Sequence, residues 1–341
     1  MKLDEFDFDL PEKLIAQHPC DKRDESRLLI LHKNTGQIEH KHFFDIINYL
    51  HPGDVLVRNV SKVIPARLYG TKEDTGAKVE VLILNINNDI CECLCGNAKT
   101  IKKDTIIKFS NNLKGQCIEV KDEGIRIIKM IYKGIFLEIL NEVGQMPTPP
   151  YIHEMLKDNS RYNNVYAEVN GSAACPTAGL HFTDELISKL KSKGIIIADV
   201  ILHVGLGTFK PVKENNIEDH NMHYEHYIMP KATADILNKA KQENRRIISV
   251  GTTSTRTLET VFSKYNSFKE DEGDTNIFIY PPYNFKAIDC QITNFHLPKS
   301  TLIMMISAFT SKEMILNTYK EAIKEEYRFF SFGDSMFITN E

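Results

Sequence analysis

The sequence predicts an α/β main domain into which a small antiparallel β-barrel domain is inserted. Between residues 67 and 143, short runs of β-favouring residues alternate with Gly, Asn, Asp and Lys turns, which is typical of a small barrel. Prolines at 147, 149 and 150 then mark an exit from that domain. After residue 151, segments with helical spacing alternate with apolar runs, the pattern of an α/β domain.

The domain boundaries follow from this change of pattern. The first sixty residues are expected to rejoin the α/β part, so that residues 1–65 and 148–341 form a discontinuous main domain. Residues 66–147 are then the inserted barrel. The strands expected in the barrel segment are 79–84, 90–94, 105–109, 117–120, 125–131 and 135–139.

Within the main domain, a capped helix is expected at 183–193, because an acidic first turn precedes apolar Leu186, Ile187 and Leu190 and Gly194 ends it. The almost continuous apolar run 195–204 is typical of a strand buried on both faces. The other expected helices are 231–242, 254–265, 301–309 and 312–327, and the other expected strands are 247–250, 277–280 and 290–294.

Composition excludes several classes of protein. With 42% hydrophobic and 26% charged residues, the chain is neither disordered nor fibrous. A net charge of −4 argues against a protein that coats nucleic acid without specificity. It does not exclude a folded RNA that binds to a local basic patch. The N-terminus is acidic and lacks an apolar run, and the longest apolar stretches, 195–204 and 302–309, are too short to span a bilayer. We expect a cytoplasmic protein with no membrane partner.

The cysteines bear on metal binding. An odd number, 7, fits free thiols in a reducing compartment better than a disulfide framework. Cys91, Cys93 and Cys95 alternate along a predicted strand and lack the C-x-x-C spacing of a metal knuckle, so buried thiols are favoured over a metal site. We expect no metal.

Polar and glycine-rich segments follow the predicted strands of the main domain, where ligands bind in such folds. In segment 203–209, Gly205 and Gly207 would let the backbone approach a ligand closely. This segment is not a dinucleotide fingerprint, because Lys210 stands where a third glycine belongs, and an ordinary tight turn would explain it equally well.

Segment 250–259 places Gly251 and a run of hydroxyl residues at the opening of a helix, followed by Arg256. Backbone N–H groups, hydroxyl donors and the positive helix end would together favour an anionic or polar ligand. One hydroxyl could simply cap the helix, but capping does not require the whole run or the arginine.

Histidines mark three further segments. Segment 219–226 carries three histidines and two acids, but the histidines are three residues apart, so acid–base chemistry fits better than a metal. Segments 176–182 and 294–301 each place a histidine beside an aromatic residue near the start of a helix. Capping of the helix alone does not require a histidine beside an aromatic residue, so these pairs are candidates for a functional site.

Taken together, these segments resemble the S-adenosylmethionine:tRNA ribosyltransferase-isomerase family of queuosine biosynthesis. The resemblance covers almost the whole chain and is least distinctive in the barrel. Departures are Lys62 where arginine is common, Cys175 where alanine is common, and Pro282 where glycine is usual. The matching motifs are LIAQHPCDKRDESRLLIL (14–31), GDVLVRNVSKVIPARLYG (53–70), AACPTAGLHFT (173–183), LHVGLGTFKPV (202–212), IEDHNMHYE (217–225), VGTTSTRTLE (250–259), TNFHLPKSTLIMMISAF (293–309) and YRFFSFGDSMFI (327–338).

The resemblance implies an activity and the same fold. Family members transfer and isomerise the ribosyl moiety of S-adenosylmethionine onto 7-aminomethyl-7-deazaguanine at the tRNA wobble position. Epoxyqueuosine-tRNA forms, and adenine and methionine leave. S-adenosylmethionine is thus implied as a co-substrate, with no permanently bound cofactor, and the anticodon loop of tRNA as the partner.

This chemistry assigns expected roles to the polar segments. A modest base could remove the acidic C5′ proton beside the sulfonium, and Arg256 suits the methionine carboxylate. For proton transfer we expect His223 and Glu225, with His181, His203 and His296 as further candidates; the alternative is that His223 and Glu225 only brace a loop. The expected substrate-binding residues are Thr177, Gly205, Gly207, Thr208, Phe209, Thr252, Thr253, Ser254, Arg256, Asn294, Lys299 and Ser300. The expected tRNA contacts are Arg23, Arg27, Arg58, Lys62 and Arg67.

Two other functions stay open at this stage. One is a different S-adenosylmethionine- or nucleoside-processing enzyme on the same α/β domain, against which the N-terminal motifs and the barrel insertion argue. The other is an RNA-binding module without catalysis, which would not need so many histidine- and hydroxyl-bearing loops at strand ends.

Overall fold

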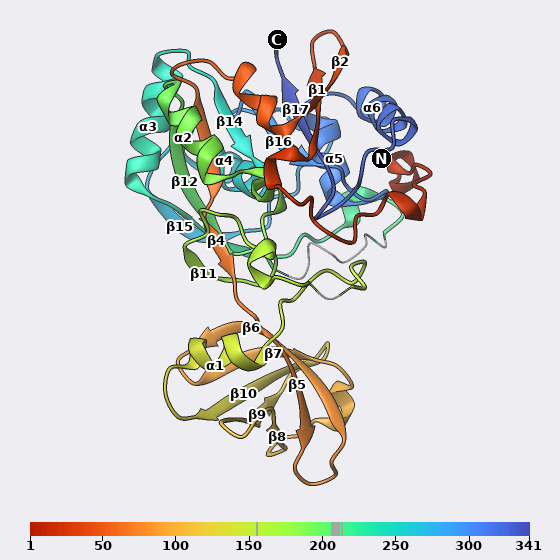
Figure 1. Cartoon of the computed structure of the whole chain (residues 1–341), viewed down its shortest axis with the longest axis vertical. Helices are drawn as coiled ribbons and strands as arrows, with labels where there is room; N and C mark the ends of the chain where they lie inside the picture. The colour runs from red at the N-terminus through yellow and green to blue at the C-terminus, as the bar shows by residue number, and fades with distance from the viewer. Residues whose placement is uncertain (155, 206–211, 213) are drawn as a thin grey trace. The chain divides into compact units, whose positions relative to one another are not determined.

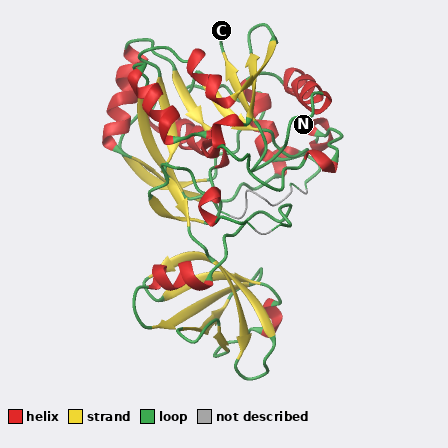
Figure 2. Cartoon of the chain, in the orientation of Figure 1, coloured by secondary structure: helices red, strands yellow, loops and turns green. Residues whose placement is uncertain are grey.

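The computed structural model describes residues 1–154, 156–205, 212 and 214–341, and it divides into two compact units. One unit comprises Met1–Ser61, Pro150–Glu168 and Pro176–Glu341, and it contains a large sheet with helices (Figures 1 and 2). The other comprises Lys62–Pro149 and Val169–Cys175, and it contains a closed barrel. Both halves of the predicted fold class are confirmed.

A nine-stranded mixed sheet forms the centre of the first unit, in the order β15-β13-β12-β3-β14-β16-β17-β1-β2 (Figure 1). The central strands β12, β3, β14 and β16 run parallel, whereas β13 and β17 run antiparallel to their neighbours β12 and β16. The strands are β1 (Arg27–His32), β2 (Ile38–His42), β3 (Val55–Asn59), β12 (Ile196–Leu202), β13 (Glu225–Met229), β14 (Ile247–Val250), β15 (Asp271–Thr275), β16 (Cys290–Asn294) and β17 (Ser335–Thr339).

Helices cover both faces of this sheet. Ile248, Val250 and Ile292 pack on one face against Phe43 and Leu186, which come from a 3₁₀ helix and from α2. Because side chains alternate along a strand, Ser249 points to the other face, where its hydroxyl contacts that of Thr255 on α4 at 2.8 Å. The α-helices of this unit are α2 (Asp184–Ser192), α3 (Lys231–Gln242), α4 (Gly251–Tyr265), α5 (Thr301–Phe309) and α6 (Lys312–Lys324).

Short 3₁₀ helices connect many of the strands and helices. They are η1 (Leu3–Phe6), η2 (Glu12–Leu14), η3 (Arg23–Glu25), η4 (Phe43–Asn48), η6 (Asn159–Tyr162), η7 (Thr177–His181) and η9 (Ile217–Asp219) in the α/β unit, and η5 (Ala98–Thr100) in the barrel unit. No helix in the described part of the chain is long and apolar enough to cross a bilayer.

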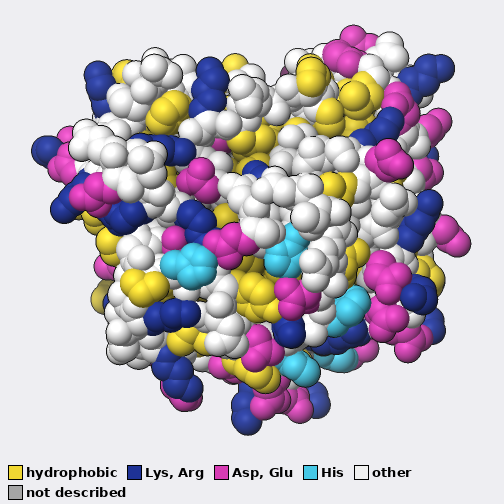
Figure 3. All heavy atoms as spheres, turned by 90° about the horizontal axis from the view of Figure 1, so that it is seen from above, with side chains coloured by type: hydrophobic (Ala, Val, Ile, Leu, Met, Phe, Trp, Pro, Cys, Tyr) yellow, Lys and Arg dark blue, Asp and Glu magenta, His cyan; other side chains and the backbone are white. Residues whose placement is uncertain are grey.

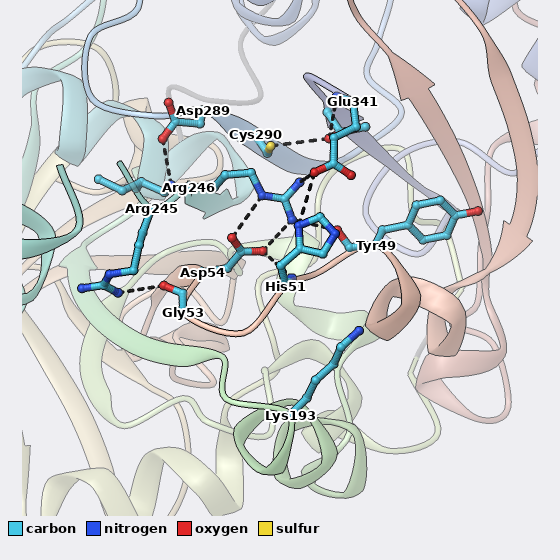
Figure 4. A network of polar contacts seen from close by, with 12 residues as sticks. Tyr49, His51, Gly53, Asp54, Lys193, Arg245, Arg246, Asp289, Cys290 and Glu341 are labelled. Carbon is cyan, nitrogen blue, oxygen red and sulfur yellow. Dashed lines mark hydrogen bonds and ion pairs between the residues drawn. The ribbon is translucent and has the colours of Figure 1, made fainter. Parts of the chain in front are cut away.

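Ion pairs close the amino-terminal edge of the central strands (Figure 4). Arg246, just before β14, donates to Asp54, just before β3, and to the C-terminal residue Glu341. Asp289, just before β16, accepts from the backbone N–H of Ile247 at 2.8 Å. These contacts bind the starts of three strands and the chain terminus to one another.

The barrel of the second unit is closed and fully antiparallel, in the order β10-β7-β6-β5-β8-β9. Its glycines allow close packing: a Cβ on Gly70 would lie 2.7 Å from the Phe109 ring. The strands are β5 (Arg67–Lys72), β6 (Lys78–Asn87), β7 (Ile90–Cys95), β8 (Ile106–Lys108), β9 (Leu113–Val120) and β10 (Ile125–Tyr132). A separate pair is formed by β4 (Ser61–Val63) and β11 (Val169–Ser172).

Cys91, Cys93 and Cys95 lie buried on β7, as predicted from their alternation. Burial raises the pKa of Cys91 and Cys95 to about 12, so these thiols stay protonated and behave as small apolar side chains.

Two predicted elements are wrong. Residues 135–139 were expected to form a strand, but 136–139 belong to helix α1 (Phe136–Val143), in which Phe136, Ile139 and Leu140 are buried. Apolar residues at this spacing fit a helix as well as a short strand, and packing decided between them. Residues 277–280 form no strand; the strand of this region is β15, which precedes them and pairs with β13.

Candidate active site

The topology gathers the polar segments at one edge of the large sheet. The parallel strands β3, β12, β14 and β16 all end there. β13 and β17 begin there, because each is antiparallel to the strand beside it, and β1 begins there because it is parallel to β17. The segments that follow residues 202, 250 and 294 therefore meet the segments that precede residues 27, 225 and 335.

A hollow at this edge, which we name the Arg256 pocket, has an empty volume of about 480 Å³ including its open mouth. Its lining residues are His220, Met222, His223, Glu225, Arg256, Ile277, Phe278, Ile279, Thr301, Leu302 and Met305.

A buried ion pair forms one wall of the Arg256 pocket. Arg256 Nη1 donates to Glu225 Oε2, and the two residues are only 5% and 4% exposed. Glu225 Oε1 also accepts from the backbone N–H of Gly205 at 2.9 Å. Nε and Nη2 of Arg256 are buried without a hydrogen-bond partner in the described part of the chain. The guanidinium thus keeps N–H donors that its described neighbours do not use.

The histidines of this region differ in position. His220 and His223 line the Arg256 pocket, and His220 Nδ1 contacts Glu214 Oε2 at 2.8 Å. His203 is stacked on His226, with ring centroids 6.1 Å apart, and burial together with His226 lowers the pKa of His203. His203 is therefore neutral at pH 7.

A second hollow at the same edge, the His181 pocket, is lined by Arg23, Ser26, His181 and Arg161, among other residues. Arg161 donates from Nη1 and Nη2 to the carbonyl oxygens of Asp21 and Cys20, while its Nε is buried without a hydrogen-bond partner among described residues. Two cationic side chains therefore stand at this pocket beside a buried imidazole.

Hydrogen bonds define the protonation of His181. Asn294 Nδ2 lies 3.2 Å from His181 Nε2 and also donates to the carbonyl oxygen of Phe330, so Nε2 is the accepting nitrogen. Nδ1 then carries the proton toward Ser26 Oγ at 2.7 Å, and Ser26 donates onward to the carbonyl oxygen of Arg23. Burial lowers the pKa of His181 to about 4, which agrees with this neutral ring.

Thr177 and Asn294, two of the expected substrate-binding residues, belong to the same polar chain, with Thr177 Oγ1 3.4 Å from Asn294 Oδ1. Thr252 and Thr253 lie in the first turn of α4, and Thr253 Oγ1 is buried without a partner among described residues. Ser254 donates to the carbonyl oxygen of Val250. Gly251 opens the helix at φ +81°, a conformation that favours glycine.

In the segment after β16, the expected site residues contact other parts of the protein. His296 is buried, contacts Thr293 Oγ1 at 2.8 Å, and burial lowers its pKa to about 3. Ser300 caps α5 by accepting from the backbone N–H of Ile303. Lys299 pairs with Asp4 and Asp7 at 2.9 and 3.0 Å. Gly207, Thr208 and Phe209 lie outside the described residues.

Most of the expected tRNA contacts are engaged within the protein. Arg58 pairs with Asp199 at 2.6 Å, and Arg67 pairs with Glu80 at 3.2 Å. Arg27 lies over the Tyr327 ring at 3.7 Å, and Arg23 donates to the carbonyl oxygens of Leu180 and Ser160.

Lys62 is exposed. On the face of the molecule shown in Figure 3, Lys and Arg side chains are interspersed with Asp and Glu, so that this face offers no broad basic surface.

Several pocket residues were not predicted. Met222, Phe278, Leu302 and Met305 line the Arg256 pocket and are apolar, so nothing in the sequence separates them from core residues. The four-residue spacing of Thr301 and Met305 places them on one face of α5, but this spacing does not mark that face as a pocket wall. In the described ranges, no group of three or more His, Cys, Asp and Glu side chains is placed to hold a metal ion.

Comparison with known proteins shows the family to which the chain belongs. The family model described as "Queuosine biosynthesis protein" matches residues 3–338. Curated relatives named S-adenosylmethionine:tRNA ribosyltransferase-isomerase include one from Staphylococcus haemolyticus, 59% identical, and one from Staphylococcus aureus, 57% identical. Each alignment covers 99% of this chain and 100% of the relative.

A solved structure, that of S-adenosylmethionine tRNA ribosyltransferase from Thermotoga maritima, is 40% identical with a TM-score of 0.57. It is matched over 98% of this chain and 99% of its own. The chain therefore belongs to the S-adenosylmethionine:tRNA ribosyltransferase-isomerase family, which confirms the family predicted from the motifs.

Proposed function

We propose that this chain transfers and isomerises the ribosyl moiety of S-adenosylmethionine onto 7-aminomethyl-7-deazaguanine at the wobble position of tRNA. The products are epoxyqueuosine-tRNA, adenine and methionine. S-adenosylmethionine is consumed as a co-substrate, no cofactor is permanently bound, and the reaction takes place in the cytoplasm with its tRNA. The observation that carries this proposal is the Arg256 pocket, where histidines and a buried ion pair meet at the carboxyl edge of the sheet.

We assign removal of the C5′ proton to His223. The adjacent sulfonium stabilises the carbanion that forms, so a base of ordinary imidazole strength suffices. His223 lines the Arg256 pocket, whereas His203, though neutral at pH 7, is not among the described residues that line it. His203 is therefore the second candidate for the same role.

We assign Glu225 a charge-pairing role in place of proton transfer. Its carboxylate accepts hydrogen bonds from Arg256 and from the backbone N–H of Gly205, so both of its oxygens are already engaged within the protein. This assignment departs, for Glu225, from the expectation of proton transfer and follows the alternative that it braces a loop, and it leaves His223 as the proton-transfer residue of the pair.

For the tRNA, we propose that the His181 pocket receives part of the anticodon loop. Sequence-specific proteins usually bind RNA at unstacked loop bases, with cationic side chains on the phosphates. Arg23 and Arg161 supply such cations, and the neutral His181 supplies a polar wall.

Adenine release tests the proposal. Purified protein is incubated with S-adenosylmethionine and tRNA that carries 7-aminomethyl-7-deazaguanine, and free adenine is measured by chromatography. Adenine should appear only with this tRNA, in proportion to the modified nucleoside formed. Equal release with tRNA that carries guanine would contradict the acceptor, and release without tRNA would indicate a different S-adenosylmethionine-cleaving enzyme.

A further inference from the structure

We infer that the Arg256 pocket holds the methionine end of S-adenosylmethionine and selects it by the paired charges of its α-amino acid group. This inference rests on the proposed function, because it names the part of the co-substrate that this pocket binds. Three features of the pocket carry it: the N–H donors of Arg256 that no described residue uses, the charge balance of the ion pair, and the apolar side chains of the lining.

Arg256 is equipped for a ligand carboxylate. Nη1 is used by Glu225, but Nε and Nη2 are buried without partners among described residues. A buried N–H donor left unpaired is destabilising, so the site gains when a ligand supplies acceptors. A carboxylate matches two N–H groups of one guanidinium in a two-point fork, which a single neutral acceptor cannot do.

The charge of the wall favours a zwitterion over a simple anion. Arg256 and Glu225 together carry no net charge, and both are buried. A ligand with a carboxylate alone would add one unbalanced negative charge to this buried site, and a ligand with an ammonium alone would add one positive charge. An α-amino acid adds one negative and one positive charge, with its carboxylate toward Arg256 and its ammonium toward Glu225.

The rest of the lining suits a thioether chain. Met222, Leu302 and Met305 are flexible or branched apolar side chains that pack well around methylene groups and sulfur. Phe278 adds an aromatic ring, whose face attracts a sulfonium cation. Adenine, by contrast, carries no carboxylate that could accept from Nε and Nη2 of Arg256 in a two-point fork.

A series of small ligands tests the inference on the unmodified protein. Binding is measured by titration calorimetry with L-methionine, 4-(methylthio)butanoate, which lacks the ammonium, and 3-(methylthio)propylamine, which lacks the carboxylate. Each deletion should weaken binding by about tenfold or more, since it leaves one buried charge unbalanced. Equal affinity for all three ligands, or no binding of L-methionine at millimolar concentration, would overturn the inference.

A pair of matched variants locates the site. Arg256→Lys removes the two-point fork and should weaken L-methionine binding by about tenfold or more. The control is Arg246→Lys, which alters an arginine–carboxylate pair at the opposite edge of the sheet and should leave L-methionine affinity unchanged. Thermal melting of both variants shows that each is folded. A loss of affinity in Arg246→Lys equal to that in Arg256→Lys would overturn the assignment.

The outcomes separate this inference from the proposed function. If adenine release requires the modified tRNA but the ligand series shows no preference for the zwitterion, the reaction stands and the placement of methionine is wrong. If adenine rather than L-methionine loses affinity in Arg256→Lys, the pocket holds the nucleobase and the inference is again overturned. If the ligand series behaves as expected but adenine release fails, the pocket is an amino acid site and the proposed reaction is wrong.

Discussion

Arg246 and Asp54 form a two-point ion pair at the amino edge of the central sheet, with Nε–Oδ1 and Nη2–Oδ2 distances of 3.1 and 2.5 Å (Figure 4). Asp54 is buried, and Arg246 also donates to the carbonyl oxygen of Tyr49 and to Glu341. The Arg256–Glu225 pair lies at the opposite edge, where the parallel strands end. The protein thus uses one arginine–carboxylate pair to join strand starts and another to line a pocket.

Arg246→Ala should lower the free energy of unfolding by about 3 kcal/mol, because it leaves the buried Asp54 carboxylate without its cation. Adenine release per folded molecule should be unchanged, since the pair is remote from the pockets. Urea unfolding provides the measurement. The control Arg245→Ala removes a neighbouring arginine whose side chain pairs with the more exposed Glu243, and it should cost no more than about 1 kcal/mol. Equal losses of unfolding free energy in the two variants would mean that the Arg246–Asp54 pair stabilises the fold no more than an exposed ion pair does.

Acid should destabilise the protein through its buried histidines. The folded-state pKa of His296 is lowered to about 3 by burial, below the usual value of 6.5, so the unfolded chain takes up this proton first. The stabilisation is complete above pH 6.5 and is lost as the pH falls toward 3. Between pH 7.5 and 5 this histidine should cost about 2 kcal/mol.

The variant His296→Gln tests this reasoning, because it removes the titrating group and keeps a polar side chain near Thr293. Its urea-measured stability should fall by about 2 kcal/mol less than that of the parent protein between pH 7.5 and 5. The control His18→Gln alters a histidine whose side chain is 58% exposed, and its pH dependence should match the parent. An unchanged pH dependence in His296→Gln would show that this ring is not buried as a neutral group.

His223→Ala should affect turnover, whereas Glu225→Gln should affect stability and substrate affinity. His223→Ala should lower kcat by about 100-fold or more while S-adenosylmethionine binding and thermal stability stay close to the parent values. Glu225→Gln should instead lower thermal stability and S-adenosylmethionine affinity together, because it leaves the buried Arg256 charge unbalanced. Steady-state kinetics, calorimetry and melting curves measure the three quantities. Near-normal turnover in His223→Ala would transfer the proton-transfer role to His203.

Lys62 is the cleanest of the expected tRNA contacts to test, because its side chain is exposed whereas Arg27, Arg58 and Arg67 hold other parts of the protein. If Lys62 contacts a phosphate of the single-stranded loop, Lys62→Ala should reduce the slope of log K against log salt by about 0.7. Fluorescence anisotropy with labelled tRNA gives the slope. The control Lys231→Ala removes another exposed lysine, on α3, and should leave it unchanged. An unchanged slope in Lys62→Ala would place the tRNA elsewhere.

Sequence patterns predicted the regular elements well where they were long and periodic. The capped helix at 183–193 corresponds to α2, and the apolar run at 195–204 corresponds to β12. The prediction failed for residues 135–139 and 277–280, because short apolar runs fit a helix, a strand or a loop until their neighbours are known. Strand β13 was not predicted, although it carries Glu225 at its first position.

By itself, the sequence determined the fold class, the family, and the segments that hold the polar residues, because periodicity, turn residues and motifs are local properties of the chain. Only the tertiary structure decided which of those residues meet. Glu225 and Arg256 are 31 residues apart and become an ion pair because β13 starts at the edge where β14 leads into α4. His181, on η7, and Asn294, at the end of β16, are 113 residues apart and also come into contact. His296, one position past Phe295, is buried. Contact across a sheet depends on strand order and direction, which no local pattern encodes.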